Sequence, residues 1–396
     1  MKTFKGLIDV TFREGQQSPL MFSLPKYRFC LNEKKKIVAY LLKIGIRTFE
    51  FFSPIVNELE ARDFESLRDY IKSLSFNKAK LLAHCRVNYQ DAQAALRDGF
   101  DGLNLYLRLS DIAEQLYRKS LPEVAEMAKK LVISLRNQFP NIYIRFSCED
   151  AFKTKLENIT FVYDQLHQYV DTFGFPDTTG MATPEEARER LQFLIKRYPR
   201  VDFECHFHND RGFALVNSFE AVKNGCHWVD VSVLGLGERS GITSVKGMLF
   251  NLLHLDEELV SNYNLKFCYP LNNFVAKVLG IDIPYSEPVS LINKTHVAGV
   301  HQAAVLKVRQ SYETQSLERF GLNQSRVLLG PLTGWHAIKN YIREVFKIEI
   351  SEDQAKTITK EFKRLVVKHK GWSCNRILLK LSEKLKISPH TLQYEG

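Results

Sequence analysis

Two histidines near the middle of the chain are spaced so that both can bind one metal ion. His206 and His208 lie at the end of an apolar, strand-like run. Side chains at positions i and i+2 of a β-strand point to the same face of the sheet, so both imidazoles can be directed at one ion. The alternative is a pair of surface histidines, and the choice depends on whether a third ligand lies nearby.

A carboxylate after the first strand-like run is the candidate third ligand. The chain reads DVTFREGQQ over residues 9–17, which places Arg13 and Glu14 directly after this run. Two histidines and a carboxylate leave coordination positions open for a substrate, and they accept zinc, manganese or magnesium. A divalent ion held in this way polarises a ketone, and the permanently charged Arg13 is suited to stabilise the oxyanion that forms.

Polar side chains follow most of the other strand-like runs as well. Arg145 is the most informative, because a cation inside a protein needs an anionic partner; the alternative is that it faces solvent. The loop LGLGERSG at residues 234–241 contains three glycines and lets a ligand approach the backbone closely, although this pattern alone is not specific. The other candidates at strand ends are Glu50, His84, Arg86, Asn88, Ser147, Glu149, Asp177 and Thr178.

Short β-rich runs alternate with longer helical patterns, and this alternation predicts the elements that position these side chains. It repeats eight times before residue 258, which is typical of an α/β protein with a closed (β/α)8 TIM barrel. An open, doubly wound sheet is the alternative, but no GxGxxG motif follows the first strand. The expected strands are Gly6–Thr11, Ile46–Phe52, Ala79–Cys85, Gly102–Leu107, Ile142–Ser147, Val170–Phe175, Val201–His206 and Trp228–Val233. Among the expected helices are Glu33–Lys43, Tyr89–Arg97, Pro122–Arg136, Pro184–Lys196 and Leu215–Asn224.

The alternation stops after about residue 258, which predicts a second region. We place a TIM-barrel catalytic domain at residues 1–270 and a smaller, mostly helical C-terminal region, with lid and dimerisation roles, at residues 271–396. The segment Leu271–Glu287, which contains or adjoins three prolines, is expected to be a connecting segment. The clearest helical patterns beyond it are Trp335–Phe346 and Ser351–Val367.

The composition is that of an ordinary globular protein, with 45% hydrophobic and 25% charged residues. Seven scattered cysteines without a CxxC metal pair indicate reduced thiols. No apolar run approaches the roughly 20 residues that span a bilayer. The short apolar stretch near the N-terminus ends at Asp9, so it predicts a first strand and not a signal peptide. We therefore expect a cytoplasmic protein without a membrane partner.

The net charge of +10 requires either anionic partners or a solvated basic surface. Part of the excess lies between Lys356 and Lys386, where basic residues recur at helical spacing among apolar ones, and this pattern favours a solvated helix face. A substrate with phosphates and carboxylates would also be attracted by the positive charge. Nucleic acid is an alternative partner, which the intact metal and arginine positions argue against, so we expect no nucleic acid binding.

Taken in order along the chain, six stretches resemble the pyruvate-carboxyltransferase-like barrel family, whose members include isopropylmalate synthase, homocitrate synthase, citramalate synthase and HMG-CoA lyase. The stretches are DVTFREGQQ (9–17), EFFSP (50–54), FSCEDAF (146–152), PDTTGMATP (176–184), ECHFHNDRG (204–212) and GLGERSGIT (235–243). They occur in the order of the family and cover essentially the whole barrel, so the resemblance implies a barrel enzyme that depends on a divalent metal.

The C-terminal region separates the branches of this family. THVAGVHQAAVLKVRQSYE (295–313) and GPLTGWHAIKNY (330–341) are similar to the lid of homocitrate synthases, and HMG-CoA lyases lack such an extension. The resemblance implies an acyltransferase that condenses acetyl-CoA with a 2-oxo acid, with 2-oxoglutarate as the best match, to give homocitrate and CoA. The alternative is a sister synthase that makes 2-isopropylmalate from 2-oxoisovalerate or citramalate from pyruvate.

The resemblance also implies a role for each candidate residue. The divalent metal ligands are Glu14, His206 and His208. The catalytic residues are Arg13, Glu204, His301 and Tyr312, of which the last three serve proton transfer at the acetyl methyl and the last two reach in from the second subunit of a homodimer. The residues around the 2-oxo acid are Gln17, Glu50, Asn88, Arg145, Ser147 and Thr178. The residues near acetyl-CoA are Gly235, Gly237, Glu238 and Arg239.

One departure from the family pattern bears on the substrate. Homocitrate synthases usually have a histidine after the third strand that helps to hold the distal carboxylate of 2-oxoglutarate, whereas this chain has Asn88. A neutral amide donates a weaker hydrogen bond than a charged group. Arg145, the other contact of the distal carboxylate, is kept and argues against an alkyl-chain substrate. The length of the 2-oxo acid therefore stays open.

Overall fold

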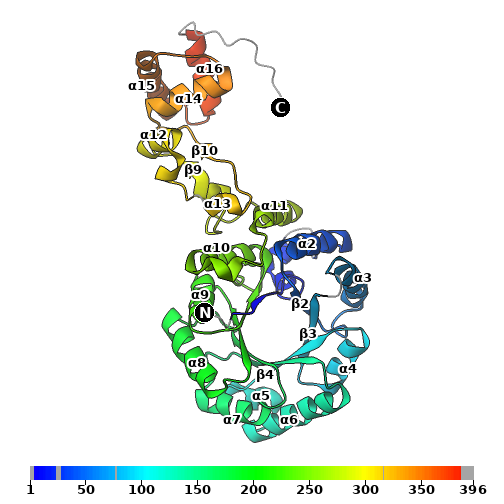
Figure 1. The fold of residues 1–396 in the computed structure, drawn as a ribbon. Coiled ribbons are helices and arrows are strands. Elements are labelled where there is room, and N and C mark those ends of the chain that lie inside the picture. The colour runs from blue at the N-terminus through cyan, green and yellow to red at the C-terminus, as the bar shows by residue number, and fades with distance from the viewer. Residues whose placement is uncertain (1–3, 24–27, 76–77, 315, 385–396) are drawn as a thin grey trace. The chain divides into compact units, whose positions relative to one another are not determined.

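Eight parallel strands form a closed barrel in the first part of the chain (Figure 1). The computed structural model describes residues 4–23, 28–75, 78–314 and 316–384. The strands are β1 (Gly6–Asp9), β2 (Thr48–Phe52), β3 (Lys80–Arg86), β4 (Gly102–Arg108), β5 (Tyr143–Glu149), β6 (Thr172–Asp177), β7 (Asp202–Phe207) and β8 (Trp228–Val231). Each strand pairs with the next one in the sequence, and β8 closes the ring by pairing with β1. The predicted (β/α)8 fold is confirmed, with strand ends shifted by one or two residues.

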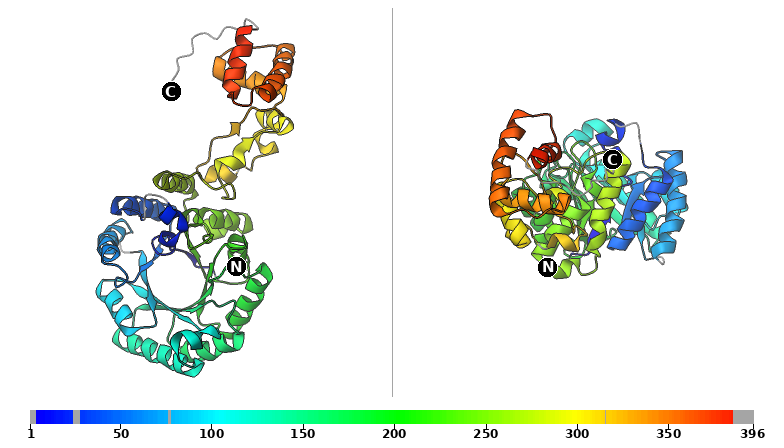
Figure 2. Two further views of the ribbon diagram at one scale, coloured as in Figure 1. Left: turned by 180° about the vertical axis from the view of Figure 1, so that it is seen from behind. Right: turned by 90° about the horizontal axis from the view of Figure 1, so that it is seen from above.

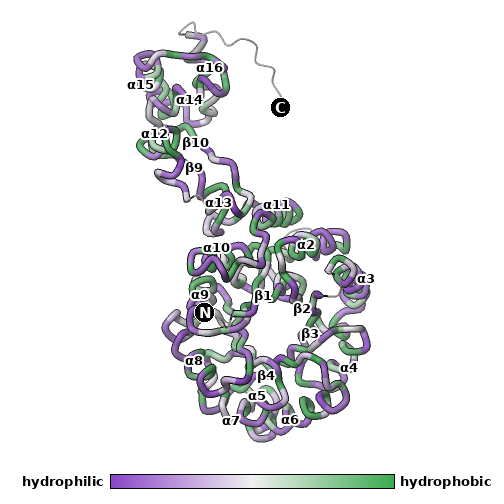
Figure 3. The backbone as a smooth tube through the Cα atoms, viewed as in Figure 1, coloured by the Kyte–Doolittle hydropathy of each residue, from purple (hydrophilic) through white to green (hydrophobic). Residues whose placement is uncertain are grey.

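Helices in the connections between strands surround the barrel, and Figure 2 shows the same ring from behind. The longer ones are α2 (Leu31–Ile44), α3 (Glu58–Ser75), α4 (Tyr89–Arg97), α6 (Leu121–Gln138), α7 (Leu156–Leu166), α8 (Pro184–Arg197), α9 (Ala214–Lys223) and α10 (Val245–Leu255); the short ones are η1 (Gly15–Gln17), α1 (Pro19–Ser23), α5 (Ile112–Tyr117) and η2 (Val233–Gly235). Hydrophobic and hydrophilic residues alternate along these helices (Figure 3), which is the pattern of a helix with one face on a core. The strands carry nearly continuous apolar runs because both of their faces are buried.

Local sequence signals explain where helices begin. At the start of α8, Thr183 accepts a hydrogen bond from the N–H of Glu186, and the Glu186 carboxylate accepts one from the N–H of Thr183. This capping box satisfies N–H groups that have no partner within the helix. Asn88 caps α4 in a related way, because its side-chain oxygen accepts from the N–H groups of Gln90 and Asp91 at 2.8 and 3.3 Å.

The first compact unit extends beyond the predicted domain boundary at residue 270. It ends at Pro288, and the second unit begins at Val289. The segment that begins at Leu271 was expected to be a connection, but much of it is helical: after η3 (Glu257–Val260) and η4 (Leu265–Phe267), α11 (Cys268–Leu279) packs against α2. Pro270 does not prevent this helix, because it lies in the first turn, where its missing N–H would have no helical partner.

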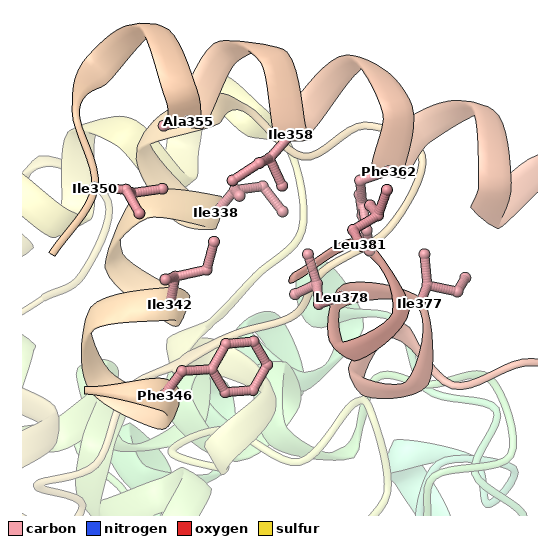
Figure 4. Close-up of a cluster of buried hydrophobic side chains, with 10 residues drawn as sticks. All are labelled: Ile338, Ile342, Phe346, Ile350, Ala355, Ile358, Phe362, Ile377, Leu378 and Leu381. Atoms are coloured by element: carbon pink, nitrogen blue, oxygen red, sulfur yellow. The ribbon is translucent and has the colours of Figure 1, made fainter. Parts of the chain in front are cut away.

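The second unit has a hydrophobic core of its own (Figure 4). Three helices surround it: α14 (Trp335–Phe346), α15 (Glu352–Lys368) and α16 (Cys374–Lys384). The first two confirm the predicted helices. The elements before them are η5 (Leu291–Lys294), β9 (Thr295–His296), α12 (Gly299–Lys307), η6 (Arg309–Ser311), α13 (Ser316–Arg319) and β10 (Arg326–Val327), and β9 pairs with β10 in parallel. The unit is therefore mostly helical, as predicted.

All seven cysteines carry free thiols, and five of them are buried. Within the described ranges, no helix is long and apolar enough to cross a membrane.

Candidate active site

A cavity of about 420 Å³ lies at the carboxyl ends of the barrel strands. This is the end of an α/β barrel where strand-to-helix connections bring functional side chains together. The predicted residues that line this cavity are Arg13, Glu14, Gln17, Arg145, Ser147, Thr178, Glu204, His206, His208, Glu238 and Arg239. They come from connections and strand ends spread over more than 200 positions of the sequence, so barrel closure assembles them.

Glu14, His206 and His208 converge on one point of the cavity wall. The Nε2 atoms of the two histidines are 3.3 Å apart, and Oε1 of Glu14 lies 3.9 Å from Nε2 of His208. The three side chains are buried, and one potential ligand atom from each lies within 4.8 Å of the other two. The segment after β1 and the end of β7 therefore bring the three side chains together, and their role as metal ligands remains a prediction.

This arrangement fits a divalent ion. Two imidazole nitrogens about 2.1 Å from one tetrahedral zinc lie about 3.4 Å apart, which is close to the separation of these two Nε2 atoms. Oδ2 of Asp230 lies 3.1 Å from Nδ1 of His206. Because an ionised carboxylate only accepts, Nδ1 of His206 donates this hydrogen bond and Nε2 keeps its lone pair for a metal.

The charge states of the ligands also suit a cation. Burial alone would raise the pKa of Glu14, but Arg13, the two histidines and the backbone N–H of Glu238 lower this pKa to about 2. Burial, reinforced by the neighbouring His206, lowers the pKa of His208 to about 3. At neutral pH Glu14 is therefore ionised and His208 is neutral, which are the protonation states that bind metals.

A buried ionic network joins three strands next to these ligands. Arg145 on β5 pairs with Asp230 on β8 at 3.0 Å and with Glu50 on β2. Glu50 also binds Arg13, with 2.8 Å between Nη2 and Oε1. Arg145 is only 1% exposed, and although burial opposes its charge, the carboxylates of Asp230, Glu204 and Glu50 raise its pKa above the ordinary value. Arg145 thus points into the barrel, and the surface alternative is excluded.

Glu204 on β7 differs from the other carboxylates. Burial raises the pKa of Glu204 well above its ordinary value; Arg145, at 3.5 Å, opposes this and Asp230 adds to it. Its Oε1 has no hydrogen-bond partner in the described part of the chain. Burial therefore favours the protonated form of Glu204, and in that form it can donate a hydrogen bond. A second set of close ligand atoms, from Glu204, His206 and Asp230, fits a cation less well, because Arg145 pairs with both of its carboxylates.

Three polar residues of the cavity were not among the candidates from the sequence. They are Asn104, Tyr106 and Asp230, whereas His84 and Glu149, which also line the cavity, were expected at strand ends. Asn104 lies 3.1 Å from Nδ1 of His84 and accepts a hydrogen bond from Ser147 at 2.7 Å, and Tyr106 stacks on His84 with ring centroids 4.3 Å apart. Asn104 and Asp230 stand inside the apolar strands GLNLYLR and WVDV. A polar residue in a strand buried on both faces must find a polar partner, and this signal could have identified them.

Asn88 lies outside the cavity, contrary to the predicted contact with the 2-oxo acid. Its side chain is exposed and is engaged in capping α4. β3 continues to Arg86, so the side chain that reaches the cavity comes from the strand itself, at His84, and not from the loop after it. This placement does not support the predicted contact of Asn88 with the 2-oxo acid.

The glycine-rich loop after β8 is a tight turn that supports Glu14, one of the candidate metal ligands. Gly235 and Gly241 have φ values of 68° and 84°, and a Cβ atom on Gly241 would lie 2.1 Å from the carbonyl oxygen of Gly235. The turn itself therefore requires these glycines. The N–H of Glu238 donates to Oε1 of Glu14 at 2.9 Å, while Arg239 pairs with Asp210. The predicted contact of Gly235, Gly237, Glu238 and Arg239 with acetyl-CoA remains a prediction.

His301 and Tyr312 belong to the second unit and contact each other. His301 lies on α12, and Tyr312 directly follows η6. Their rings stack with centroids 3.9 Å apart and planes 24° apart, and both side chains are exposed. The pair that the sequence predicted is therefore assembled within the second unit, and its role at the barrel cavity remains a prediction.

Known proteins resemble this chain in both of its units. The HMGL-like family model matches residues 6–275, and a model described as homocitrate synthase post-HMGL domain-like matches residues 291–370. The mitochondrial homocitrate synthase of Saccharomyces cerevisiae is 33% identical over 92% of this chain and 80% of its own length, and the cytosolic isozyme is 33% identical over 91% and 81%. The hydroxymethylglutaryl-CoA lyase of Pseudomonas aeruginosa has a TM-score of 0.58 over 71% of this chain and 95% of its own, at 19% identity, which shows the shared fold alone.

These likenesses agree with the division of the chain. The HMGL-like match covers the barrel, and the second match lies within the second unit. The yeast relatives span both, at an identity and a coverage that establish common descent. The chain therefore belongs to the HMGL-like family and, within it, to the acyltransferases of the homocitrate synthase type.

Proposed function

We propose that this chain condenses acetyl-CoA with 2-oxoglutarate and releases homocitrate and CoA. The placement of Glu14, His206 and His208 beside Arg13 in one cavity carries this proposal, in a chain whose two regions match those of homocitrate synthases. One carbon–carbon bond forms, between the acetyl methyl carbon and the ketone carbon. One water hydrolyses the thioester and releases CoA.

Glu14, His206 and His208 would hold a divalent ion, which polarises the ketone as a Lewis acid when it is bound. Ligand sets of two histidines and one carboxylate accept zinc, manganese and magnesium with different affinities, so these residues alone do not select one metal. Asp230 orients His206 through its hydrogen bond to Nδ1, and the loop after β8 orients Glu14. Such supporting hydrogen bonds hold metal ligands in the binding geometry.

Arg13 is the candidate for stabilising negative charge on the former ketone oxygen. Glu50 and Glu14 hold its guanidinium at the cavity wall, so little reorganisation is needed when the charge develops. The other polar side chains on this wall, Gln17, Arg145, Ser147 and Thr178, are candidates for binding the carboxylates of the 2-oxo acid. Glu50 lies behind them and aligns both arginines.

Proton transfer at the acetyl methyl falls to three residues. His301 is the candidate base, and Tyr312 stacks on its ring. Burial favours the protonated form of Glu204, which is suited to donate a hydrogen bond to the thioester oxygen as that oxygen gains negative charge. Glu238 and Arg239 border the same cavity and are candidates for contact with acetyl-CoA.

A panel of 2-oxo acids, run with and without a chelator, tests this function. The purified chain receives acetyl-CoA with 2-oxoglutarate, 2-oxoisovalerate or pyruvate, and free CoA is measured. We expect the fastest release with 2-oxoglutarate, loss of release on chelation and recovery when a divalent ion is restored, because the cavity pairs a metal site with two arginines. Arg13→Ala should remain folded and lose about 100- to 1,000-fold in rate, the usual cost of removing one oxyanion donor.

Other outcomes of the panel would contradict the proposal in defined ways. Preference for 2-oxoisovalerate or pyruvate would identify a 2-isopropylmalate or citramalate synthase. CoA release that survives chelation would rule out the metal site. Arg188 on α8, whose side chain is 42% exposed, provides the control, since Arg188→Ala removes the same charge at a residue that does not line the cavity and should leave the rate unchanged.

We also propose that the chain forms a homodimer. The second unit exposes several large apolar side chains, including Val300 (75% exposed), Val308 and Leu332 (67% exposed). Exposed apolar side chains favour an interface, which a second copy of the chain would cover. A cytoplasmic location remains a prediction, because the yeast relatives include a mitochondrial and a cytosolic protein.

A further inference from the structure

Each of the two exposed rings in the second unit is followed in sequence by a buried polar residue. His301 precedes Gln302, which is 0% exposed, and Tyr312 precedes Glu313, which is 6% exposed. Buried polar side chains in proteins are nearly always hydrogen-bonded, so the partners of Gln302 and Glu313 show which segments these two residues hold in place.

Gln302 and Glu313 both form hydrogen bonds with the same residue, His296. Nε2 of Gln302 donates to the backbone oxygen of His296 at 3.3 Å and to that of Leu328 at 2.6 Å. Oε1 of Glu313 lies 2.9 Å from Nε2 of His296. His296 is itself buried in β9, and its backbone oxygen also accepts from the N–H of Leu328. One residue therefore ties α12 to the corner that follows η6.

A second set of contacts fixes the carboxylate of Glu313. Oγ of Ser325 donates to Oε2 at 2.8 Å, and Nζ of Lys294, which is also buried, lies 3.4 Å from the same oxygen. Burial alone would raise the pKa of Glu313, but these hydrogen bonds and the nearby Lys294 lower it, so the carboxylate is ionised. Burying such charges is costly unless their geometry is well defined, so the position of Glu313 is narrowly constrained.

We infer that His296 is a positioning residue that holds His301 and Tyr312 in their stacked arrangement through Gln302 and Glu313. Exposed side chains are free to change rotamer, and they keep a ring contact only when the backbone segments that carry them are fixed to each other. His296 supplies that connection through its ring to one segment and through its carbonyl oxygen to the other. The relevance of the stack to proton transfer rests on the proposed function, whereas the stack itself does not.

The ring-proton resonance of His301 reports the stack directly. In the full chain labelled with ¹³C on histidine, the Tyr312 ring shifts this resonance upfield. His301→Gln assigns the signal, and Tyr312→Leu defines its unstacked position. We expect His296→Leu and Glu313→Leu to move the signal to the unstacked position. His296→Gln should retain the stack, because an amide can still donate to the Glu313 carboxylate.

The controls separate positioning from general destabilisation. Phe346→Leu weakens the core of the second unit without touching the network, and it should leave the His301 signal in place. An unchanged signal in folded His296→Leu would overturn the inference. If that variant does not fold, Gln302→Leu and Ser325→Ala each remove side-chain hydrogen bonds of the network. An unshifted His301 signal in both variants would also overturn the inference.

Kinetics then test the catalytic consequence. Misplacing a catalytic group by about 1 Å can cost on the order of 100-fold in rate, so we expect kcat for CoA release to fall by about 10- to 100-fold in His296→Leu. The KM for the 2-oxo acid should stay nearly unchanged, since the network lies outside the barrel cavity. Loss of the stack with an unchanged kcat would show that the stack has no role in the reaction. If the wild-type chain released no CoA with any 2-oxo acid, the proposed function would be wrong. The position of the His301 resonance would still test whether His296 holds the stack.

Discussion

Among the individual residues, the buried charges are the most demanding to accommodate. Arg13 and Arg145 share the carboxylates of Glu50 and Asp230, and none of the four side chains is more than 6% exposed as a residue. A buried charge that loses its partner costs several kcal/mol, about 3–5 in measured cases. The four residues therefore form as one unit, and this unit holds Arg13 at the cavity wall before a substrate arrives.

Asp9, at the end of β1, leads to a prediction about pH. Burial raises the pKa of Asp9 from 3.8 to about 7, although hydrogen bonds from Thr11 oppose the shift. The folded-state pKa exceeds the unfolded one, so this group's contribution to stability is complete below pH 3.8 and is lost as the pH rises through about 7. Between these values, we expect the free energy of unfolding to fall more steeply for the wild type than for Asp9→Asn, as measured by urea titration.

The control for this experiment is an exposed carboxylate. Asp353→Asn, in the first turn of α15, removes an exposed carboxylate, and it should leave the slope of stability against pH close to that of the wild type. Parallel pH profiles for the wild type and Asp9→Asn would show that Asp9 is ionised in the folded protein at these pH values.

At the scale of elements, the second unit depends on the core between α14, α15 and α16. Phe362 on α15 is 0% exposed within this core. Phe362→Ala should destabilise the unit by about 3–5 kcal/mol, because it removes a large buried ring and leaves a cavity. Val367 on the same helix is 62% exposed. Val367→Ala should therefore change stability by no more than about 0.5 kcal/mol.

The three tryptophans allow this unfolding to be followed in each unit. Trp335 and Trp372 pack against the core of the second unit, and Trp228 lies on β8 of the barrel. In a Trp228→Phe background, fluorescence reports the second unit alone, and Phe362→Ala should move this transition to lower urea. Chelator-sensitive metal binding monitors the barrel in the same titration. If Phe362→Ala lowered the stability of the barrel by the same amount, the two units would unfold together.

In the whole molecule, the candidate catalytic groups are divided between two compact units. His206 belongs to the barrel and His301 to the second unit. If a dimer exchanges its second units, His206→Gln and His301→Gln should each be inactive alone but form one intact site in a mixed dimer. Random pairing of equal amounts would then restore roughly one quarter of the wild-type CoA release.

The result depends on subunits that can mix. Co-expression of the two variants provides this, and sedimentation velocity measures the fraction of dimer. The double variant, with both changes in one chain, is the matched control and should stay inactive under the same conditions. Dimers without recovered activity would mean that each copy completes its own site.

Local sequence was enough to predict most of the architecture. Strands and helices follow from the spacing of apolar residues and from caps such as Thr183, which act within a few positions of the chain. The convergence of Glu14, His206 and His208 could be predicted as well, because barrel topology places strand ends at one edge once the strands are known. α11 was missed because a proline in a first turn resembles a proline in a connection.

The amino-acid sequence by itself determined the eight strands, the helices between them and the chemical types available at the strand ends. Only the tertiary structure decided which polar residues meet across the barrel: Asp230 with Arg145, and Asn104 with His84. The physical reason is the separation in sequence between the residues that interact. Secondary structure depends on neighbours along the chain, whereas the pairing of buried charges depends on the closure that brings β2, β5 and β8 around one interior.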